Sequence, residues 1–340
     1  KDSSSSQKVR PVTNSSAPHV SGSSNSRSPR GPNLLCNLRY VWESFRLKRW
    51  VAVSDLSRCY RCMHTSEQTN NMRLMVYPCQ PLNPDNQQFQ VLRMSRCTYG
   101  DQICSCLLEC IVRDIIAPAC STALGREILE SGRYVDDISG GDDDQAILDE
   151  AMKDISDTLE KYGFSFKMLL TNYMKFKPDG SSECGQVEAG QDTELVFHHS
   201  WNFRTDEVKN IPNFNVHSKI RGSYAGPGLL ETDVDALIIT KRLVSRLMGQ
   251  AFSIDGSFLS PLKATFAVFF SQVCQLHKEW DEPVQTELAE EIKSFIKVLK
   301  EKIPNITPTP RCLVPAQHHP VGLDAQSDGS LYLSSWVIYL

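Results

Sequence analysis

Three aspartates in this sequence have the spacing of a divalent-metal site. Asp55 follows the apolar run Val51-Ala52-Val53, and Asp136 and Asp137 are adjacent between two short apolar segments. A strand end with one carboxylate beside a hairpin tip with two would gather the oxygen ligands that Mg²⁺ prefers. A pair of such ions supports phosphoryl transfer. Adjacent aspartates are also common in polar turns, so the pair alone leaves both interpretations open.

The elements that must position these acids follow from hydrophobic periodicity. We expect strands over 50–60 and 72–78, and a hairpin around the acidic pair in GRYVDDISGG. Apolar residues recur at every fourth position from Ile103 through Leu107 and Ile111 to Ile115, which predicts a helix that Pro118 ends.

After the acidic pair the sequence predicts helices, with strand-like segments between the first of them and the rest, at 164–172 and 194–203. Asp142, Asp143 and Asp144 are expected to cap a helix whose apolar face is Leu148, Met152, Ile155 and Leu159, with Gly163 at its end. Further helices are expected over 233–250, 260–277 and 284–302, the last capped by Asp281 with Pro283 in its first turn. Strands return in 320–340. This order indicates an α+β fold followed by a helical part and the start of another α/β unit.

Charge is distributed unevenly along the 340 residues. Residues 1–120 hold 15 lysines and arginines against 8 acidic residues, although the whole chain has a net charge of −4. A basic first third suits a polyanion such as nucleic acid. A solvated charged surface is the other interpretation.

The sequence also bears on compartment and completeness. It has 12 cysteines and no secretion signal, so we expect reduced thiols and an intracellular protein. No uncharged apolar run reaches the roughly 18 residues that span a bilayer, so no membrane partner is expected. The chain opens without Met and stops within an apolar run, as expected for a fragment of a longer polypeptide.

Several segments in order carry a family resemblance. RYVDDI resembles the catalytic motif of reverse transcriptases, and the whole arrangement is closest to the polymerases (RNA-directed DNA polymerases) of Pao/BEL-type LTR retrotransposons. The other similar segments are 31–65, Arg93 to Gly100, YGFSFKMLLTN at 162–172, VFHHSWNFRTD at 196–206, 240–275 and IPNITPTPR at 303–311.

The resemblance implies a right-hand polymerase fold with an antiparallel palm sheet. Residues 1–54 would be partial fingers with a flexible Ser-rich start, and 55–205 the palm with interleaved fingers. Residues 206–305 would be a helical thumb or connection. Residues 306–340 would be a linker and the first strands of a truncated RNase H-like domain, in which Asp328 best fits a catalytic carboxylate.

The resemblance also implies roles for single residues. Asp55, Asp136 and Asp137 would be the catalytic ligands of two Mg²⁺ or Mn²⁺ ions. The substrate-binding residues would be Tyr60 against the sugar, Arg10 on the incoming triphosphate, Tyr99 and Gly100 beneath the templating pair, and Lys167 near the pyrophosphate.

The implied activity is template-directed DNA synthesis from dNTPs on an RNA or DNA template–primer. Protease, RNase H and integrase segments of a Pol polyprotein would be its neighbours. The resemblance also implies a location in a cytoplasmic retroelement particle or in the nucleus. Departures from the family pattern occur at Asn14, at His198 and in 254–257, which lacks a proline. A catalytically inactive remnant that binds nucleic acid or another partner therefore stays open, as does a metal-dependent nuclease.

Overall fold

The computed structural model describes most of the chain in two compact units, Lys1–Thr171 and Asn172–Leu340. The described residues are 14–340, with gaps at 18–19, 21, 72, 79–87, 198, 210–213, 217–218, 221–222, 225–227, 254–259, 278, 314–323, 330–333 and 340. Arg10, His198 and 254–257 therefore lie outside the described residues. The division into four parts expected from the sequence stays a prediction.

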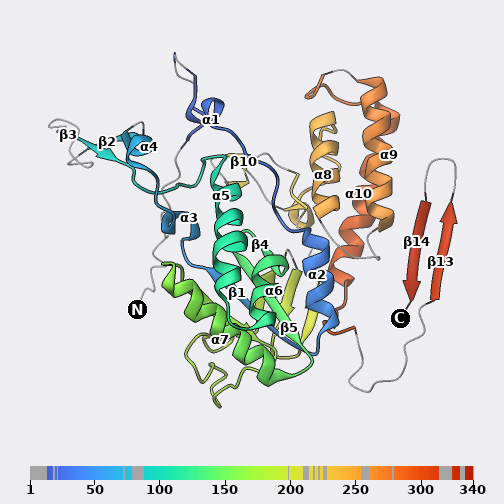
Figure 1. Ribbon diagram of the computed structural model, residues 1–340. Helices are drawn as coiled ribbons and strands as arrows, with labels where there is room; N and C mark the ends of the chain where they lie inside the picture. Colours follow the sequence, from blue (N-terminus) through green and yellow to red (C-terminus); the bar gives the residue numbers. More distant parts are fainter. Residues whose placement is uncertain are drawn as a thin grey trace, which may run out of the picture. The chain divides into compact units, whose positions relative to one another are not determined.

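The first unit alternates short helices and strands (Figure 1). Its helices are α1 (Ser24–Arg27), α2 (Leu38–Leu47), α3 (Cys59–Cys62), α4 (Glu67–Asn71), α5 (Cys104–Cys110), the π-helical η1 (Ile111–Ile116), the 3₁₀ turn η2 (Ala117–Ala119), α6 (Ala123–Ser131) and α7 (Gln145–Lys161). Its strands are β1 (Trp50–Leu56), β2 (Leu74–Pro78), β3 (Phe89–Arg93), β4 (Arg133–Tyr134), β5 (Asp137–Asp142) and β6 (Phe166–Thr171).

A four-stranded antiparallel sheet in the order β4-β5-β1-β6 is the centre of this unit. Helices α2, α6 and α7 pack against it. Gly140 of β5 lies so close to α6 that a Cβ there would stand 2.3 Å from Cδ1 of Ile128. A larger residue at this position would push the end of the Ile128 side chain aside, so the absence of a side chain on Gly140 lets α6 pack closely against β5.

Helix α7 confirms its prediction. Asp144 is the N-cap and accepts a hydrogen bond from the Ala146 amide, and Gly163 follows the helix with a φ of 80°. The four residues of the expected apolar face are all at most 3 % exposed: Leu148, Met152, Ile155 and Leu159.

The helical prediction over 102–116 is right, but its expected apolar face is wrong. Leu107 and Ile115 are 37 % and 52 % exposed. The buried positions lie one residue further along the chain, at Cys104, Leu108, Val112 and Ile116, together with Glu109. Ile103 and Ile111 are partly buried, so the expected stripe lies at the edge of the buried face, which also carries Glu109 and its contact with Arg133.

The second unit contains a small sheet and a helical part. Its strands are β7 (Thr193–Val196), β8 (His199–Asn202), β9 (Glu207–Lys209), β10 (Lys219–Ile220), β11 (Ser223–Tyr224), β12 (Thr309–Pro310), β13 (Asp324–Gly329) and β14 (Ser334–Tyr339). Its helices are the 3₁₀ turn η3 (Leu229–Glu231), α8 (Lys241–Ser253), α9 (Ser260–Leu276), α10 (Thr286–Lys302) and the 3₁₀ turn η5 (Ile303–Asn305). The main sheet has the antiparallel order β12-β9-β8-β7.

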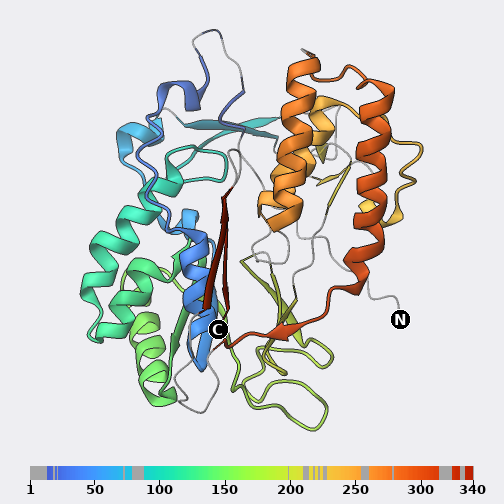
Figure 2. The same cartoon turned by 90° about the vertical axis from the view of Figure 1, so that its right-hand side faces the viewer.

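Helices α8, α9 and α10 share one apolar core, with α9 and α10 visible side by side in Figure 2. Helix α10 starts later than expected, because Gln285 is its N-cap and the amide of Val284 is bonded to the carbonyl of Ile239. Asp281 is therefore not a cap. It pairs instead with Arg242 on α8, with N–O distances of 2.6 and 2.9 Å.

Asp206 is the centre of a hydrogen-bond network in the second unit. Its carboxylate accepts bonds from Trp201 at 3.0 Å, from Asn172 at 3.0 Å and from Arg311 at 2.7 and 2.8 Å. The Arg311 side chain has no exposed surface. These residues all lie within segments that carry the family resemblance, and their bonds connect the end of β12 to the β8–β9 hairpin.

Candidate metal centre

Strand pairing brings Asp55 and the acidic pair together. In the antiparallel β1–β5 pair, Asp55 lies opposite Asp137, and the amide of Leu56 donates a 2.8 Å hydrogen bond to the carbonyl of Asp136. The register of the β1–β6 pair shifts between Ser54 and Leu56, as it does at a β-bulge, a feature that redirects side chains. The predicted strand end and hairpin tip are therefore both present and adjacent.

The three carboxylates form one cluster. One oxygen from each of Asp55, Asp136 and Asp137 lies within 4.8 Å of the others, and all three residues are partly buried. Oδ2 of Asp55 accepts from Lys167 at 2.8 Å, whereas its Oδ1 is buried without a hydrogen-bond partner. Three convergent carboxylates, one of which has a buried and unsatisfied oxygen, fit a hard divalent cation.

The electrostatic effect of the cluster extends to a neighbouring thiol. Burial raises the pKa of Cys59 to about 12, and the carboxylates of Asp136 and Asp55 add to this shift. A negative charge on this sulfur is disfavoured because acidic groups already crowd the site. Cys59 therefore stays a neutral thiol beside the carboxylates.

The turn that carries Asp136 is strained. Tyr134 pairs with Asp137, so Val135 and Asp136 form a two-residue hairpin turn, and Val135 has a φ of 57°. Glycine is the usual residue at a first turn position with positive φ. A β-branched residue in this region is a genuine outlier, and such strain costs of the order of 1–3 kcal/mol. Other contacts must hold the turn.

Arg133 supplies such a contact. Its Nη1 donates to the carbonyl of Val135 at 3.1 Å, and its Nε donates to Leu129 at 3.3 Å. The guanidinium also pairs with Glu109 through two bonds, of 3.0 and 2.6 Å. Burial raises the pKa of Glu109, and Arg133 opposes that shift. A buried ion pair is therefore hydrogen-bonded to the acidic turn through the carbonyl of Val135.

Tyr60, Tyr99 and Gly100 form a second group near the site. The rings of Tyr60 and Tyr99 meet edge to face with centroids 5.1 Å apart, and the Tyr60 hydroxyl is 2.9 Å from that of Ser105. Burial raises the pKa of Tyr60, the hydrogen bond with Ser105 lowers it, and the charge of Asp136 contributes to the rise. Gly100 has a φ of 108°, which an L side chain rarely adopts.

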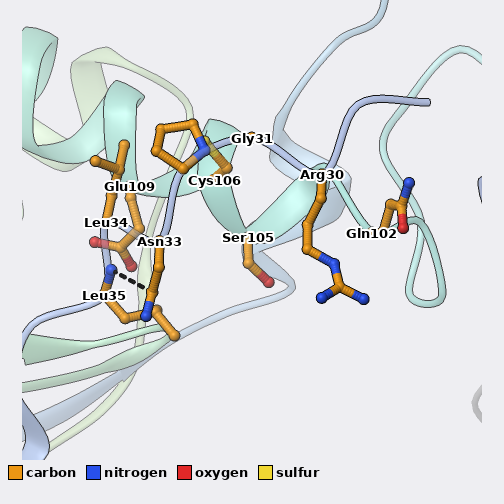
Figure 3. A pocket seen from close by; sticks show the side chains of 10 residues that line it. Arg30, Gly31, Asn33, Leu34, Leu35, Gln102, Ser105, Cys106 and Glu109 are labelled. Atoms are coloured by element: carbon orange, nitrogen blue, oxygen red, sulfur yellow. Dashed lines mark hydrogen bonds between the residues drawn. The ribbon is translucent and has the colours of Figure 1, made fainter.

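A pocket of about 310 Å³ lies between the segment 30–35 and α5 (Figure 3). Ser105 and Glu109 both line it. Arg30 and Gln102 lie toward one end in the close-up, and Leu34 and Leu35 lie toward the other. The pocket therefore borders both the residue that holds Tyr60 and the acid that holds Arg133.

The structure brings together most of the expected polymerase residues. Lys167, on β6, contacts Asp55 directly. Tyr60, Tyr99 and Gly100 belong to the same unit as the carboxylates. Asp328 lies in the second unit, on β13 opposite Ser335 of β14. Arg10 lies outside the described residues, so its expected role stays a prediction.

Sequence reasoning missed three residues that support the site: Arg133, Glu109 and Ser105. A signal for the first was available, because an arginine three residues before the acidic pair falls in the short strand-like segment that leads into the hairpin. An acid on a helix with apolar neighbours was a signal for Glu109. Ser105 gave none, since a serine among cysteines on a helix has no distinctive pattern.

Comparisons with known proteins place parts of the chain. Residues 240–340 match the family model described as "Pao retrotransposon-like RNaseH-like domain". A structure of the foamy viral protease-reverse transcriptase dRH in complex with double-stranded DNA is similar in fold, with a TM-score of 0.51 and 10 % sequence identity. The match covers 93 % of this chain and 45 % of that one, so the chain spans less than half of that protein. No curated protein matches the sequence.

The family match indicates a Pao retrotransposon-like, RNase H-like part within residues 240–340. The mixed α/β architecture with antiparallel sheets resembles that of a retroviral reverse transcriptase region. The family match begins at residue 240, well before the linker that the sequence predicted at 306. Among the described helices, none combines the length and apolar character of a membrane span.

Proposed function

We propose that this chain is the reverse transcriptase part of a retroelement Pol polyprotein and catalyses template-directed DNA synthesis. The carboxylate cluster of Asp55, Asp136 and Asp137 carries this proposal, because all three acids come from a strand end and a hairpin tip of one antiparallel sheet. The likeness in fold to a protein whose structure was determined with DNA is the supporting observation.

In this proposal the three aspartates hold two Mg²⁺ or Mn²⁺ ions. When bound, such ions activate the attacking hydroxyl and stabilise the leaving oxygen of phosphoryl transfer. The buried, unsatisfied Oδ1 of Asp55 gains a partner in this arrangement. The β-sheet fixes the carboxylates before substrate arrives, which limits reorganisation during the reaction.

Lys167 and Tyr60 act on the nucleotide. The ammonium of Lys167, next to Asp55, can neutralise or protonate the pyrophosphate leaving group. The ring of Tyr60, held by Ser105 and Tyr99, excludes a ribose 2′-hydroxyl by contact. Arg10 binds the triphosphate, and Asp328 belongs to an RNase H-like active site that other residues complete.

The partners follow from the same proposal. An RNA or DNA template–primer and dNTPs are the substrates, and the basic first 120 residues contact phosphates, so binding weakens with salt. Residues 55–205 act as palm and fingers, and 206–305 as thumb or connection. Protease, RNase H and integrase segments of the polyprotein are its neighbours.

Primer extension tests this function. Full-length chain is incubated with a labelled primer on RNA or DNA template, with dNTPs and either Mg²⁺, Mn²⁺ or EDTA. We expect metal-dependent extension that Asp136→Asn abolishes and that Asp157→Asn, an exposed change on α7, leaves intact. Binding of template–primer without extension by the unmodified chain would instead identify a catalytically inactive nucleic-acid-binding remnant.

A further inference from the structure

The Arg133–Glu109 ion pair is the most deeply buried charged pair beside the carboxylate cluster. The exposed fractions of the two side chains are 0 % and 3 %. A buried ion pair contributes little net stability, because desolvation of both charges offsets their attraction. Its presence in the core therefore calls for another explanation than stability.

The second clue is where the remaining hydrogen bonds of Arg133 go. One guanidinium nitrogen is shared between Glu109 and the carbonyl of Val135, the residue immediately before Asp136. Val135 adopts a positive φ that a β-branched residue avoids. The arginine thus holds the strained peptide that sets the direction of Asp136.

The contact also has a fixed geometry. Arg133 lies on β4 opposite Ile138 of β5, so it belongs to the same hairpin as the acids that it supports. Glu109 comes from α5, outside the hairpin, and anchors the guanidinium through two bonds. Bidentate pairing fixes the orientation of the guanidinium plane, which a lysine cannot reproduce.

We propose that Arg133, anchored by Glu109, is a positioning residue that holds the Val135–Asp136 turn in the conformation in which the three carboxylates converge on a divalent cation. This inference rests on the proposed function. Without the guanidinium the turn relaxes and the oxygens of Asp136 and Asp137 move apart from that of Asp55, so metal binding weakens.

A purely structural ion pair predicts a different result, and the chain offers a matched control. Arg311 is equally buried and pairs with Asp206 through two bonds, in the unit that contains none of the three carboxylates. Arg311→Met should therefore lower stability without changing metal affinity. Loss of Arg133 should lower metal affinity as well.

The test measures Mn²⁺ affinity by electron paramagnetic resonance of the free ion, and stability by chemical denaturation, on the full chain. The main variant is Arg133→Met with Glu109→Leu, which removes both buried charges together and so avoids leaving either one unpaired. We expect it to fold and to bind Mn²⁺ at least tenfold more weakly than the unmodified chain. The Mn²⁺ affinity of Arg311→Met should stay within twofold of that of the unmodified chain.

Arg133→Lys is the second variant and serves if the double variant does not fold. It keeps a positive charge beside Glu109 but cannot also reach Val135 with a planar fork, so a loss of at least fivefold is expected. Mn²⁺ affinity within twofold of the unmodified chain in a folded Arg133 variant would overturn the proposal. If the unmodified chain and Asp136→Asn bind Mn²⁺ equally, the proposed metal site itself fails and this inference falls with it.

Discussion

Replacing Asp136 by asparagine should stabilise the metal-free protein while it removes the metal response. The reason is that three carboxylates lie within 4.8 Å of one another. At that separation and an effective dielectric constant of about 20, Coulomb's law gives about 3.5 kcal/mol of repulsion per pair, and in bulk water about 0.9 kcal/mol. Asp136→Asn removes the repulsion with both neighbours at nearly constant volume.

The net gain is smaller than this sum, because all three residues are partly exposed and solvent screens them. We expect about 2 kcal/mol, which is a rise in Tm of roughly 4–8 °C for a unit of this size. Divalent metal should reverse the order of stability of the two proteins. A cation at 100 times its Kd stabilises the unmodified protein by about 2.7 kcal/mol and leaves the variant unchanged.

Differential scanning calorimetry in EDTA and in Mn²⁺ measures both effects. Asp157→Asn, which neutralises an exposed acid on α7, controls for the change in net charge. The electrostatic reasoning would be refuted if Asp136→Asn were less stable than the unmodified chain in EDTA, or if Mn²⁺ stabilised both proteins equally.

Three further outcomes are expected. Burial raises the pKa of Asp154, but hydrogen bonds from Thr122 and Ser121 outweigh that effect and hold the pKa at about 2, below the ordinary value of 3.8. The stabilising contribution of the ionised carboxylate is therefore present above pH 4 and lost as the pH falls toward 2. Asp154→Asn should lower the free energy of unfolding at pH 7 by about 1–2 kcal/mol. Urea titrations below pH 2 should show no difference between the two proteins. Tyr60→Ala should raise ribonucleotide incorporation relative to deoxynucleotide at least tenfold in single-nucleotide extension, and Ser105→Ala should do so to a smaller extent; an unchanged preference in both variants would make Tyr60 a core residue only. The eleven cysteines of the described residues are free thiols, so thiol titration of the denatured, unreduced chain should find nearly all 12 reactive, and several stable bridges would contradict the expected reducing compartment.

The position of each acid in the carboxylate cluster was predictable from its neighbours, but only the resemblance to reverse transcriptases favoured a shared metal site over a polar turn. An acid at the end of an apolar β-branched run and two acids between short apolar segments each mark a position on a strand or turn, and antiparallel pairing then joins them. Helix α7 could also be predicted from the sequence, because its capping residues and its apolar face indicate the same helix. Neighbouring residues determine the helix, whereas the cluster also needs the pairing of β1 with β5, which are far apart in the sequence.

The supporting contacts were not predictable, because they depend on tertiary packing. Over 103–116 apolar residues recur at every fourth position on two adjacent stripes, so periodicity alone could not select the buried one, and nothing local shows that Glu109 is buried against Arg133, 24 residues away. The late start of α10 has the same origin, because the amide of Val284 is bonded to Ile239 on a distant segment. Long-range polar partners override local preference at these places.

Anomalous diffraction from crystals of the chain soaked in Mn²⁺ with template–primer and a non-hydrolysable dNTP analogue tests the central claim most directly. The account predicts anomalous peaks for two ions among the carboxylates of Asp55, Asp136 and Asp137, and none there in Asp136→Asn. Peaks elsewhere in the protein, with no ion among these three aspartates, would contradict it.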